Sequence, residues 1–297
     1  MTSPTPSADG GFGTQDWGLL VGVALMWGSS FLLIKIGLDD FPPVTVAWLR
    51  LLFGVALLSC LPAARKPLRY RGDRGQVALL GLVWMAGPFV LFPVAEQSIP
   101  SALAGMVNGA APLFTAVIAA LWARRLPGRR QGTGLAIGFA GVVVVNAPAA
   151  ASSGGSVLGV GLVLLATALY GVAFNLTGRL EGRNGPLPVI WRAELVAVVV
   201  LTPAGLVGLI GSSPTVGGML AMVSLGAVST GLAFAAFTTL VGRVGPTRAS
   251  VTVYLIPVVA ILLGTLLNSE PVQPVSVGGV ALVLVGAYLT SRSPRAG

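Results

Sequence analysis

The chain has 297 residues and a net charge of +9; 55% of its residues are hydrophobic, only 9% are charged, and its mean hydropathy is +0.89. Soluble domains carry about 25% charged residues, so this composition excludes a soluble enzyme and a disordered chain and predicts an integral membrane protein. The chain has no His and one Cys, Cys60, which excludes Ser-His-Asp and Cys-His catalysis, His-ligated metals and internal disulfides. We expect no enzyme activity, no cofactor and no metal.

Residues 1–16 are rich in Ser, Thr, Pro, Gly and Asp and contain no Lys or Arg. They lack the basic start of a signal peptide, so we expect a disordered cytoplasmic tail. Ten apolar runs follow, each close to the about 20 residues that a helix needs to cross a bilayer. They are apolar on all sides, which favours helices over the alternating strands of a membrane barrel. The predicted spans are 17–38, 43–62, 77–95, 101–123, 132–148, 157–178, 188–210, 217–241, 248–268 and 275–291.

The basic residues gather in every second connection between the spans and at the C-terminus. All Lys and Arg residues follow this rule except Lys35, Arg50 and Arg192, which lie inside spans. The other connections carry only acidic residues, Asp39, Asp40, Glu96 and Glu270. Because Lys and Arg stay on the cytoplasmic side, we expect both termini in the cytoplasm of a bacterial cell and the chain in its inner membrane. The same rule accounts for the net positive charge, so this charge does not indicate a nucleic-acid-binding protein.

The two halves of the chain repeat one another. Trp27-Gly28 and Phe31 have counterparts in Tyr170-Gly171 and Phe174, 143 residues later, and Pro112 has a counterpart in Pro257. Trp48 and Arg50 are paired in the same way with Trp191 and Arg192. Five spans in each half is an odd number, so the second half enters the membrane from the opposite face, as in many secondary transporters. The predicted units are a first repeat over 17–148, a short extracytoplasmic linker over 149–156, a second repeat over 157–291 and a cytoplasmic tail over 292–297.

With these motifs in order, the chain resembles the drug/metabolite transporter (DMT) superfamily, specifically its EamA-type ten-helix members. The resemblance rests on Trp27 to Phe31, Pro43 followed by Arg50, Ile99 to Pro112, and Thr247 to Pro257. It implies an all-α integral membrane fold of ten transmembrane helices, arranged as two inverted five-helix repeats around a central cavity. It also implies export or uptake of small metabolites. The chain departs from the family at Arg125, where members often carry Glu.

Two arginines inside the spans are candidates for the substrate pathway. Ionisable groups within a membrane are costly and tend to face a cavity or a partner, and a guanidinium group pairs well with a carboxylate. We therefore expect Arg50 and Arg192 to line the pathway. Alternatively, both have structural roles in bonding backbone carbonyls, and Arg192 extends toward the membrane surface.

Glu194 is the only carboxylate well inside a span. Residues i and i+2 of a helix do not face each other, so Arg192 cannot be its partner. We expect Glu194 to bind a proton that is coupled to transport. The alternative is a salt bridge to another helix, for example to Arg50 or Lys35.

Other side chains are candidates for the cavity or for movement. The aromatic and amide groups of the spans suit a cavity for organic molecules, although they also pack and hydrogen-bond between helices. The prolines suit hinges in alternating access, although a static kink is equally consistent with them. Gly134-x-x-x-Gly138 predicts a close helix crossing. The pathway candidates are Trp27, Tyr170, Tyr254, Asn108 and Asn175, and the hinge candidates are Pro112 and Pro257.

We therefore expect a secondary transporter, with export favoured, of a small organic metabolite such as an amino acid or a related compound. Its partners would be the lipid bilayer, the small-molecule substrate and protons as the coupling ion. One alternative is a non-transporting membrane scaffold. The other is a membrane enzyme acting on lipid-type substrates, which the missing His and the absence of a carboxylate cluster disfavour.

Overall fold

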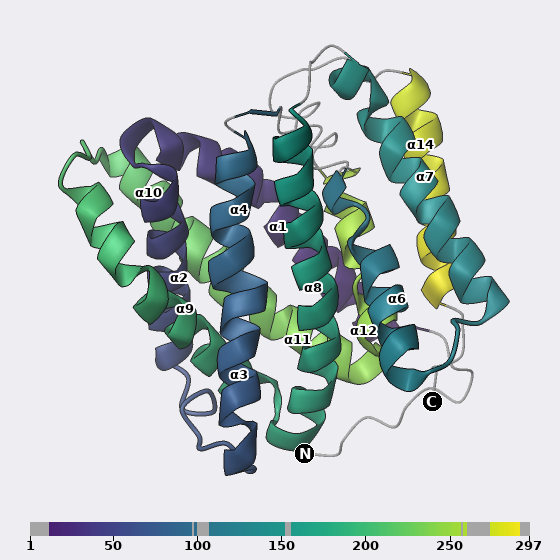
Figure 1. Ribbon diagram of the computed structural model, residues 1–297, viewed down its shortest axis with the longest axis horizontal. Coiled ribbons are helices and arrows are strands. Elements are labelled where there is room, and N and C mark those ends of the chain that lie inside the picture. Colours follow the sequence, from purple (N-terminus) through teal and green to yellow (C-terminus); the bar gives the residue numbers. More distant parts are fainter. Residues whose placement is uncertain are drawn as a thin grey trace.

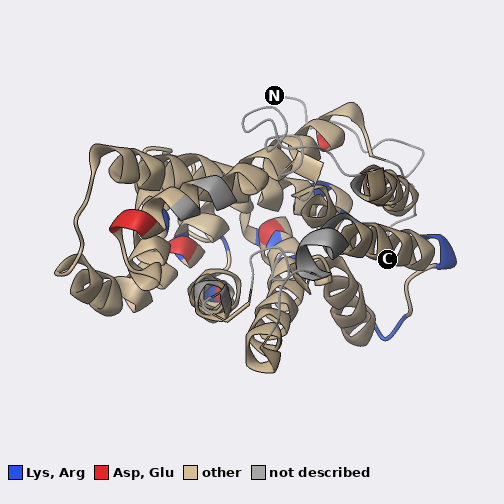
Figure 2. Cartoon of the chain, turned by 90° about the horizontal axis from the view of Figure 1, so that it is seen from above, with Lys and Arg blue, Asp and Glu red and all other residues tan. Residues whose placement is uncertain are grey.

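The computed structural model describes residues 12–96, 98–99, 107–151, 156–256, 258–259 and 274–291. Every secondary structure element in these residues is a helix, and the longer helices pack side by side (Figure 1). Seen from above, charged residues occupy only a few short stretches of the ribbon (Figure 2). The helices are α1 (Thr14–Asp40), α2 (Pro43–Ser59), η1 (Arg71–Asp73), α3 (Arg74–Leu80), η2 (Gly81–Ala86), α4 (Gly87–Glu96), α6 (Ala111–Ala123), α7 (Arg129–Ala151), α8 (Val157–Asn184), α9 (Pro186–Leu209), α10 (Val216–Gly226), η3 (Ala227–Leu232), α11 (Ala233–Val244), α12 (Pro246–Ala249) and α14 (Pro274–Ser291).

Four helical stretches of the described chain are long and apolar enough to cross a membrane: Arg71–Phe92, Val157–Asn184, Pro186–Leu209 and Val216–Val244. The first and the last each contain one π-helical turn, η2 and η3, within a continuous helical rod. The chain is thus a multi-pass helical membrane protein. The predicted spans 101–123 and 248–268 are described only in part.

Helix α1 starts earlier than the sequence suggested. Residues 1–16 were expected to be a disordered tail, but the helix begins at Thr14. Asp16 lies in its first turn, and Oδ2 of Asp16 accepts a hydrogen bond of 2.9 Å from the backbone N–H of Gly13. A carboxylate that caps the first turn satisfies a free N–H group and interacts favourably with the helix dipole, which explains the earlier start.

The helix starts recur at nearly constant spacing along the chain. Helices α1 and α8 begin at Thr14 and Val157, 143 residues apart, and α2 and α9 begin at Pro43 and Pro186, again 143 residues apart. The rods that begin with η1 and α10 start 145 residues apart. The spacing of the secondary structure therefore matches the spacing of the sequence motifs.

Helices α7 and α14 lie side by side through small residues (Figure 1). A Cβ atom on Gly141 would lie 2.6 Å from the backbone nitrogen of Val283, and one on Gly134 would lie 2.5 Å from Oγ1 of Thr290. A Cβ atom on Gly286 would clash with the backbone of Gly138. The close crossing expected at Gly134 and Gly138 is thus present, and it depends on glycine in both helices.

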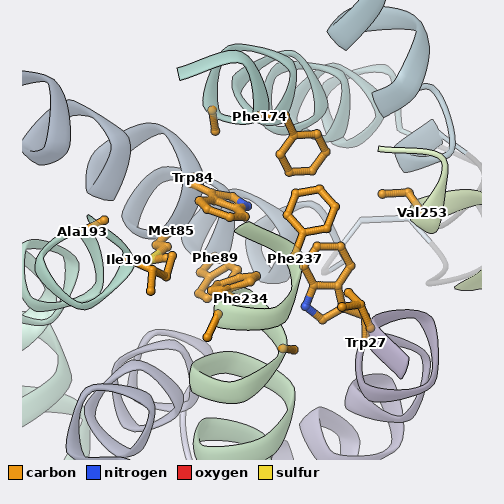
Figure 3. Packing of buried hydrophobic residues seen from close by; sticks show 14 of the residues in the cluster. Trp27, Trp84, Met85, Phe89, Phe174, Ile190, Ala193, Phe234, Phe237 and Val253 are labelled. Atoms are coloured by element: carbon orange, nitrogen blue, oxygen red, sulfur yellow. The ribbon is translucent and has the colours of Figure 1, made fainter. Parts of the chain in front are cut away.

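A cluster of aromatic rings packs between the helices in the hydrophobic core (Figure 3). Ring centroids are 4.7 Å apart for Trp84 and Phe234, 4.7 Å for Phe174 and Phe237, and 4.9 Å for Trp27 and Phe237. These rings come from α1, η2, α8 and α11, so the cluster joins helices from both halves of the chain. Tilted and edge-to-face aromatic pairs of this kind add to the energy of burial.

Candidate substrate cavity

A cavity of about 400 Å³ lies against this aromatic cluster. It extends to the point where α1 ends and α2 begins, since Leu38 and Pro43 are among its lining residues. A volume of this size accommodates a small organic molecule. The lining is largely apolar and consists of Trp27, Ser30, Ile34, Leu38, Pro43, Val46, Ala47, Arg50, Trp84, Phe89, Phe92, Asn108, Tyr170, Phe174, Phe234, Val253 and Ile256.

Arg50 is the one charged side chain among these lining residues. Its Nε donates a hydrogen bond of 3.1 Å to Oγ1 of Thr230 in η3, and its guanidinium carbon lies 3.9 Å from the ring centroid of Phe89. No carboxylate of the described residues forms an ion pair with it. The side chain is therefore fixed at Nε and on one face, while its two terminal nitrogens remain for a ligand.

Two polar atoms of the cavity residues are buried and have no hydrogen-bond partner within the described part of the chain. They are Nε1 of Trp27, a donor, and Oδ1 of Asn108, an acceptor. An unpaired buried polar group costs about 1–3 kcal/mol. A bound molecule with one acceptor and one donor would remove this cost.

Tyr170 of α8 also lines the cavity. Its ring stacks between those of Phe92 and Phe174, with centroid distances of 5.9 and 6.0 Å. Together with Trp27 from α1, Arg50 from α2 and Asn108, it lines the cavity, so the structure brings four of the residues singled out in the sequence to one place.

Asn175 and Tyr254 are placed differently, because both bond between helices. Nδ2 of Asn175 donates to the carbonyl oxygen of Thr115 in α6, at 3.0 Å. The hydroxyl of Tyr254 donates to the carbonyl oxygen of Leu135 in α7, at 2.8 Å. Neither residue is among those lining the cavity, which matches the alternative role that the sequence left open.

Arg192 also lies outside the cavity lining. Its Nη1 donates to the carbonyl oxygen of Pro188 at 3.0 Å, and its guanidinium carbon lies 5.1 Å from the ring centroid of Trp191. Arg50 and Arg192 are 142 residues apart, whereas the starts of α2 and α9 are 143 residues apart, so the offset of the helix starts pairs Arg50 with Ala193. One residue corresponds to a rotation of about 100° around a helix, so the two arginines point in different directions.

Glu194 is completely buried between α9, α2 and η3. A Cβ atom on Gly54 would lie 2.9 Å from its Oε2. Neither carboxyl oxygen has a hydrogen-bond partner, and the structure gives Glu194 an electrostatic interaction with Arg50 but no ion pair within the described residues. It does not line the cavity.

The π-helical turn η3 holds Arg50 in place. A π-turn brings residues i and i+5 to one face, so Gly226 and Gly231 both contact the backbone of α2 at Gly54. The hydroxyl of Thr230 donates to the carbonyl oxygen of Leu225 at 3.0 Å and accepts the bond from Arg50. The hydrophobic pattern of the sequence does not predict this π-turn. The five-residue spacing of Gly226 and Gly231 is the sequence feature that could have indicated it.

The two hinge candidates have different outcomes. Pro112 was expected within a continuous span, but it lies in the first turn of α6, after a turn at residues 109–110. Proline is well tolerated there because the first helical N–H groups have no partner within the helix. Pro257 lies outside the described residues.

Two ion pairs join the halves of the chain at the other end of the helices. Arg243 of α11 pairs with Asp16 of α1, and Arg183 of α8 pairs with Asp73 at 3.1 Å. Asp16 and Leu38 lie at opposite ends of α1, about 33 Å apart at 1.5 Å per residue. The ion pairs are thus remote from the end of the cavity at Leu38.

A family model for EamA-like transporters matches residues 17–147 and again residues 157–292. The chain belongs to the EamA-like transporter family. This transporter is 30% identical to the uncharacterized inner membrane transporter YedA of Escherichia coli K12, over 94% of its own chain and 93% of the relative. It is 28% identical to a protein of Salmonella typhimurium named as a probable amino-acid metabolite efflux pump, over 93% of this chain and 94% of the relative. It is 27% identical to a protein of Streptantibioticus cattleyicolor named as a probable terminal-alkyne amino-acid exporter, over 93% of both chains.

The fold also matches a known crystal structure. The TM-score is 0.77 over 92% of this chain and 95% of the other, at 20% sequence identity. The helical arrangement described here is therefore one that a crystallised protein also adopts.

Proposed function

We propose that this EamA-like transporter is a secondary transporter that moves a small organic carboxylate, such as an amino acid or a related metabolite, across the bacterial inner membrane, with export as its main direction. One observation carries the proposal: Arg50 lies in an aromatic-lined cavity, and its terminal nitrogens form no ion pair or hydrogen bond with the residues that the structure describes. Arginine binds carboxylates through two parallel hydrogen bonds. The names of two relatives, an efflux pump for amino-acid metabolites and an amino-acid exporter, support the same substrate class.

The transport mechanism that we propose is alternating access by two inverted five-helix repeats, 17–148 and 157–291, with both termini cytoplasmic. The constant spacing of the helix starts supports the repeats. The cavity reaches the end of the helices where α1 meets α2, while the two ion pairs lie toward the other end. In the proposed orientation this state faces outward, and protons are the coupling ion.

A non-transporting scaffold is the second candidate. Its helices would be expected to pack without a cavity, and its interior polar groups would pair with one another. The cavity and the unpaired atoms of Trp27 and Asn108 favour the transporter.

The test compares bacterial hosts that overproduce the wild-type protein, Arg50→Ala or Arg192→Ala at matched membrane levels. Arg192→Ala is the matched control, because it removes an equal charge outside the cavity. Extracellular metabolites are profiled by mass spectrometry, and resistance to toxic amino-acid analogues is measured. We expect the wild type and Arg192→Ala to enrich the same carboxylate outside the cells and Arg50→Ala not to do so. Profiles that equal the empty host in all strains would contradict export.

A further inference from the structure

The buried carboxyl group of Glu194 has no role in substrate contact. It lies at the contact of α2, α9 and η3, where a Cβ atom on Gly54 would lie 2.9 Å from its Oε2 and 3.2 Å from the backbone nitrogen of Gly231. Both of its oxygens are buried without a hydrogen-bond partner. An ionised carboxylate in an apolar interior is very costly unless it is paired and hydrogen-bonded. The geometry of this state therefore suits the neutral, protonated acid.

Arg50 is the complementary group. It lies one helical turn before Gly54 on α2, so it and Glu194 share one side of the contact between α2 and α9. It has no acidic partner among the described residues. While Glu194 is neutral, the charge of Arg50 is therefore balanced only by an anion in the cavity, so the arrangement described here is that of the anion-binding form.

Neither an ion pair nor a hydrogen bond joins Glu194 to any other ionisable group in the described part of the chain. The turns η2 and η3 carry none. Arg192 lies on α9 itself, Arg74 on α3 and Arg243 on α11, and α8 carries Tyr170, Arg179, Glu181 and Arg183. The structure gives Glu194 an electrostatic interaction with Arg50 alone among these described groups.

We propose that Arg50 alternates between two partners, Glu194 and the carboxylate of the substrate, so that binding of an organic anion is accompanied by uptake of one proton by Glu194. When the anion binds Arg50, a proton moves from water to a carboxyl oxygen of Glu194. When the anion leaves, Glu194 returns the proton to water and its carboxylate pairs with Arg50. This exchange rests on the proposed function, because it requires a substrate carboxylate at Arg50.

The exchange has a consequence for energetics. The loaded site holds Arg50, an anion and a neutral acid, and the empty site holds Arg50 and a carboxylate. Both have no net charge, so neither form carries a bare charge through the low-dielectric membrane. An anion and a proton cross together, so the membrane potential does not act on the pair, and export proceeds when the outward gradient of the anion exceeds the opposing proton gradient.

The first experiment measures proton uptake on binding, with purified full-length protein in detergent, a weak buffer and a pH-indicator dye. The probe is phenylpyruvate, an aromatic monocarboxylate suited to the aromatic lining. We expect the wild type to take up about one proton per bound anion and its affinity to fall up to about tenfold per pH unit on the alkaline side. In Glu194→Gln, binding takes up no proton and its affinity no longer depends on pH. Glu181→Gln is the matched control, since Glu181 is also buried but lies on α8 against Gly242, and it should behave as the wild type.

Binding without proton uptake in the wild type, or persisting uptake in Glu194→Gln, would overturn the exchange. A second measurement needs no ligand and separates this proposal from the proposed function. The infrared absorption of the protonated carboxyl group of Glu194 is titrated in the empty wild type and in Arg50→Met, with Glu194→Gln identifying the band. We expect Glu194 to remain protonated over a wider pH range in Arg50→Met. Identical titrations would overturn the exchange, even if phenylpyruvate fails to bind and the substrate class has to be revised.

Discussion

The contacts of Arg50 require a planar guanidinium group. Its Nε bonds Thr230 while its face lies over Phe89, which leaves the two terminal nitrogens for a ligand. A lysine ammonium keeps the charge but cannot make these contacts together. We expect Arg50→Lys to lower the rate of export about tenfold or more at matched membrane levels, as measured by mass spectrometry of the medium. Arg192→Lys serves as the control, and an equal loss in both variants would contradict a specific role for Arg50.

The unpaired N–H of Trp27 gives a second prediction. Trp27→Phe keeps an aromatic ring against Phe237 but removes Nε1, which has no hydrogen-bond partner among the described residues. We expect weaker binding of substrates that carry a hydrogen-bond acceptor, by about 1 kcal/mol or roughly fivefold in KM. The control is Trp191→Phe, because Nε1 of Trp191 bonds Ser59 outside the cavity lining. An unchanged KM in Trp27→Phe would show that this N–H does not contact substrate.

Candidate cavity residues can be chosen from the sequence, but the sequence does not predict whether their side chains face the cavity. Polar residues are rare in apolar spans, so Arg50, Asn108, Tyr170 and Trp27 could be named from the sequence, and all four line the cavity. Tyr254 and Asn175 were equally prominent, yet they bond neighbouring helices. Which face of a helix meets the cavity depends on its rotation within the bundle, and an apolar run that is hydrophobic on all sides carries no such information.

At the scale of the helices, the contact between α2 and η3 depends on glycine. A Cβ atom on Gly54 would lie 2.9 Å from Oε2 of Glu194 and 3.2 Å from the backbone of both Gly226 and Gly231. We expect Gly54→Ala to destabilise the protein by about 1–3 kcal/mol, the usual cost of overpacking, and to lower its Tm in detergent. Gly22→Ala in α1 is the control, since nothing lies within 4 Å of a Cβ atom there. Equal Tm values for the two variants would contradict this close contact.

The helices themselves were largely predictable, whereas their irregular turns were not. The starts of α2 and α8 fall at the predicted positions 43 and 157, because charged or Pro/Gly-rich segments delimit the apolar runs. The π-turns η2 and η3 were missed, since one extra residue within an apolar helix does not alter its composition. The break at residues 109–110 before Pro112 was missed because proline is compatible with both a kink and a helix start.

For the whole molecule, the repeat could be recognised from the sequence, although its register could not. Matching by residue type paired Arg50 with Arg192, but the helix starts Pro43 and Pro186 place Ala193 opposite Arg50. We expect one arginine among the cavity-lining residues, because a second unpaired cation there would repel Arg50. The two halves therefore share helix positions while only the first supplies the cation of the cavity.

The two ion pairs between the halves provide a prediction about the whole molecule. Asp73 and Asp16 are buried, so their pairs with Arg183 and Arg243 are less screened than exposed pairs, which contribute about 0–1 kcal/mol. We expect the double variant Asp16→Asn/Asp73→Asn to favour the state that opens at this end, and a shift of about 1.4 kcal/mol would change the ratio of states tenfold.

A cysteine in the cavity can report this shift. In a Cys60→Ala background, Ser30→Cys places a thiol among the lining residues. A membrane-impermeant thiol reagent added on the side to which the cavity opens should label this thiol more slowly in the double variant, and the same reagent on the opposite side should label it faster. Asp39→Asn, an exposed acid at the far end of α1, controls for the loss of charge. If labelling changes equally from both sides of the membrane, the double variant loosens the helix bundle as a whole. A gating role for the ion pairs therefore requires that the labelling rate falls from one side and rises from the other.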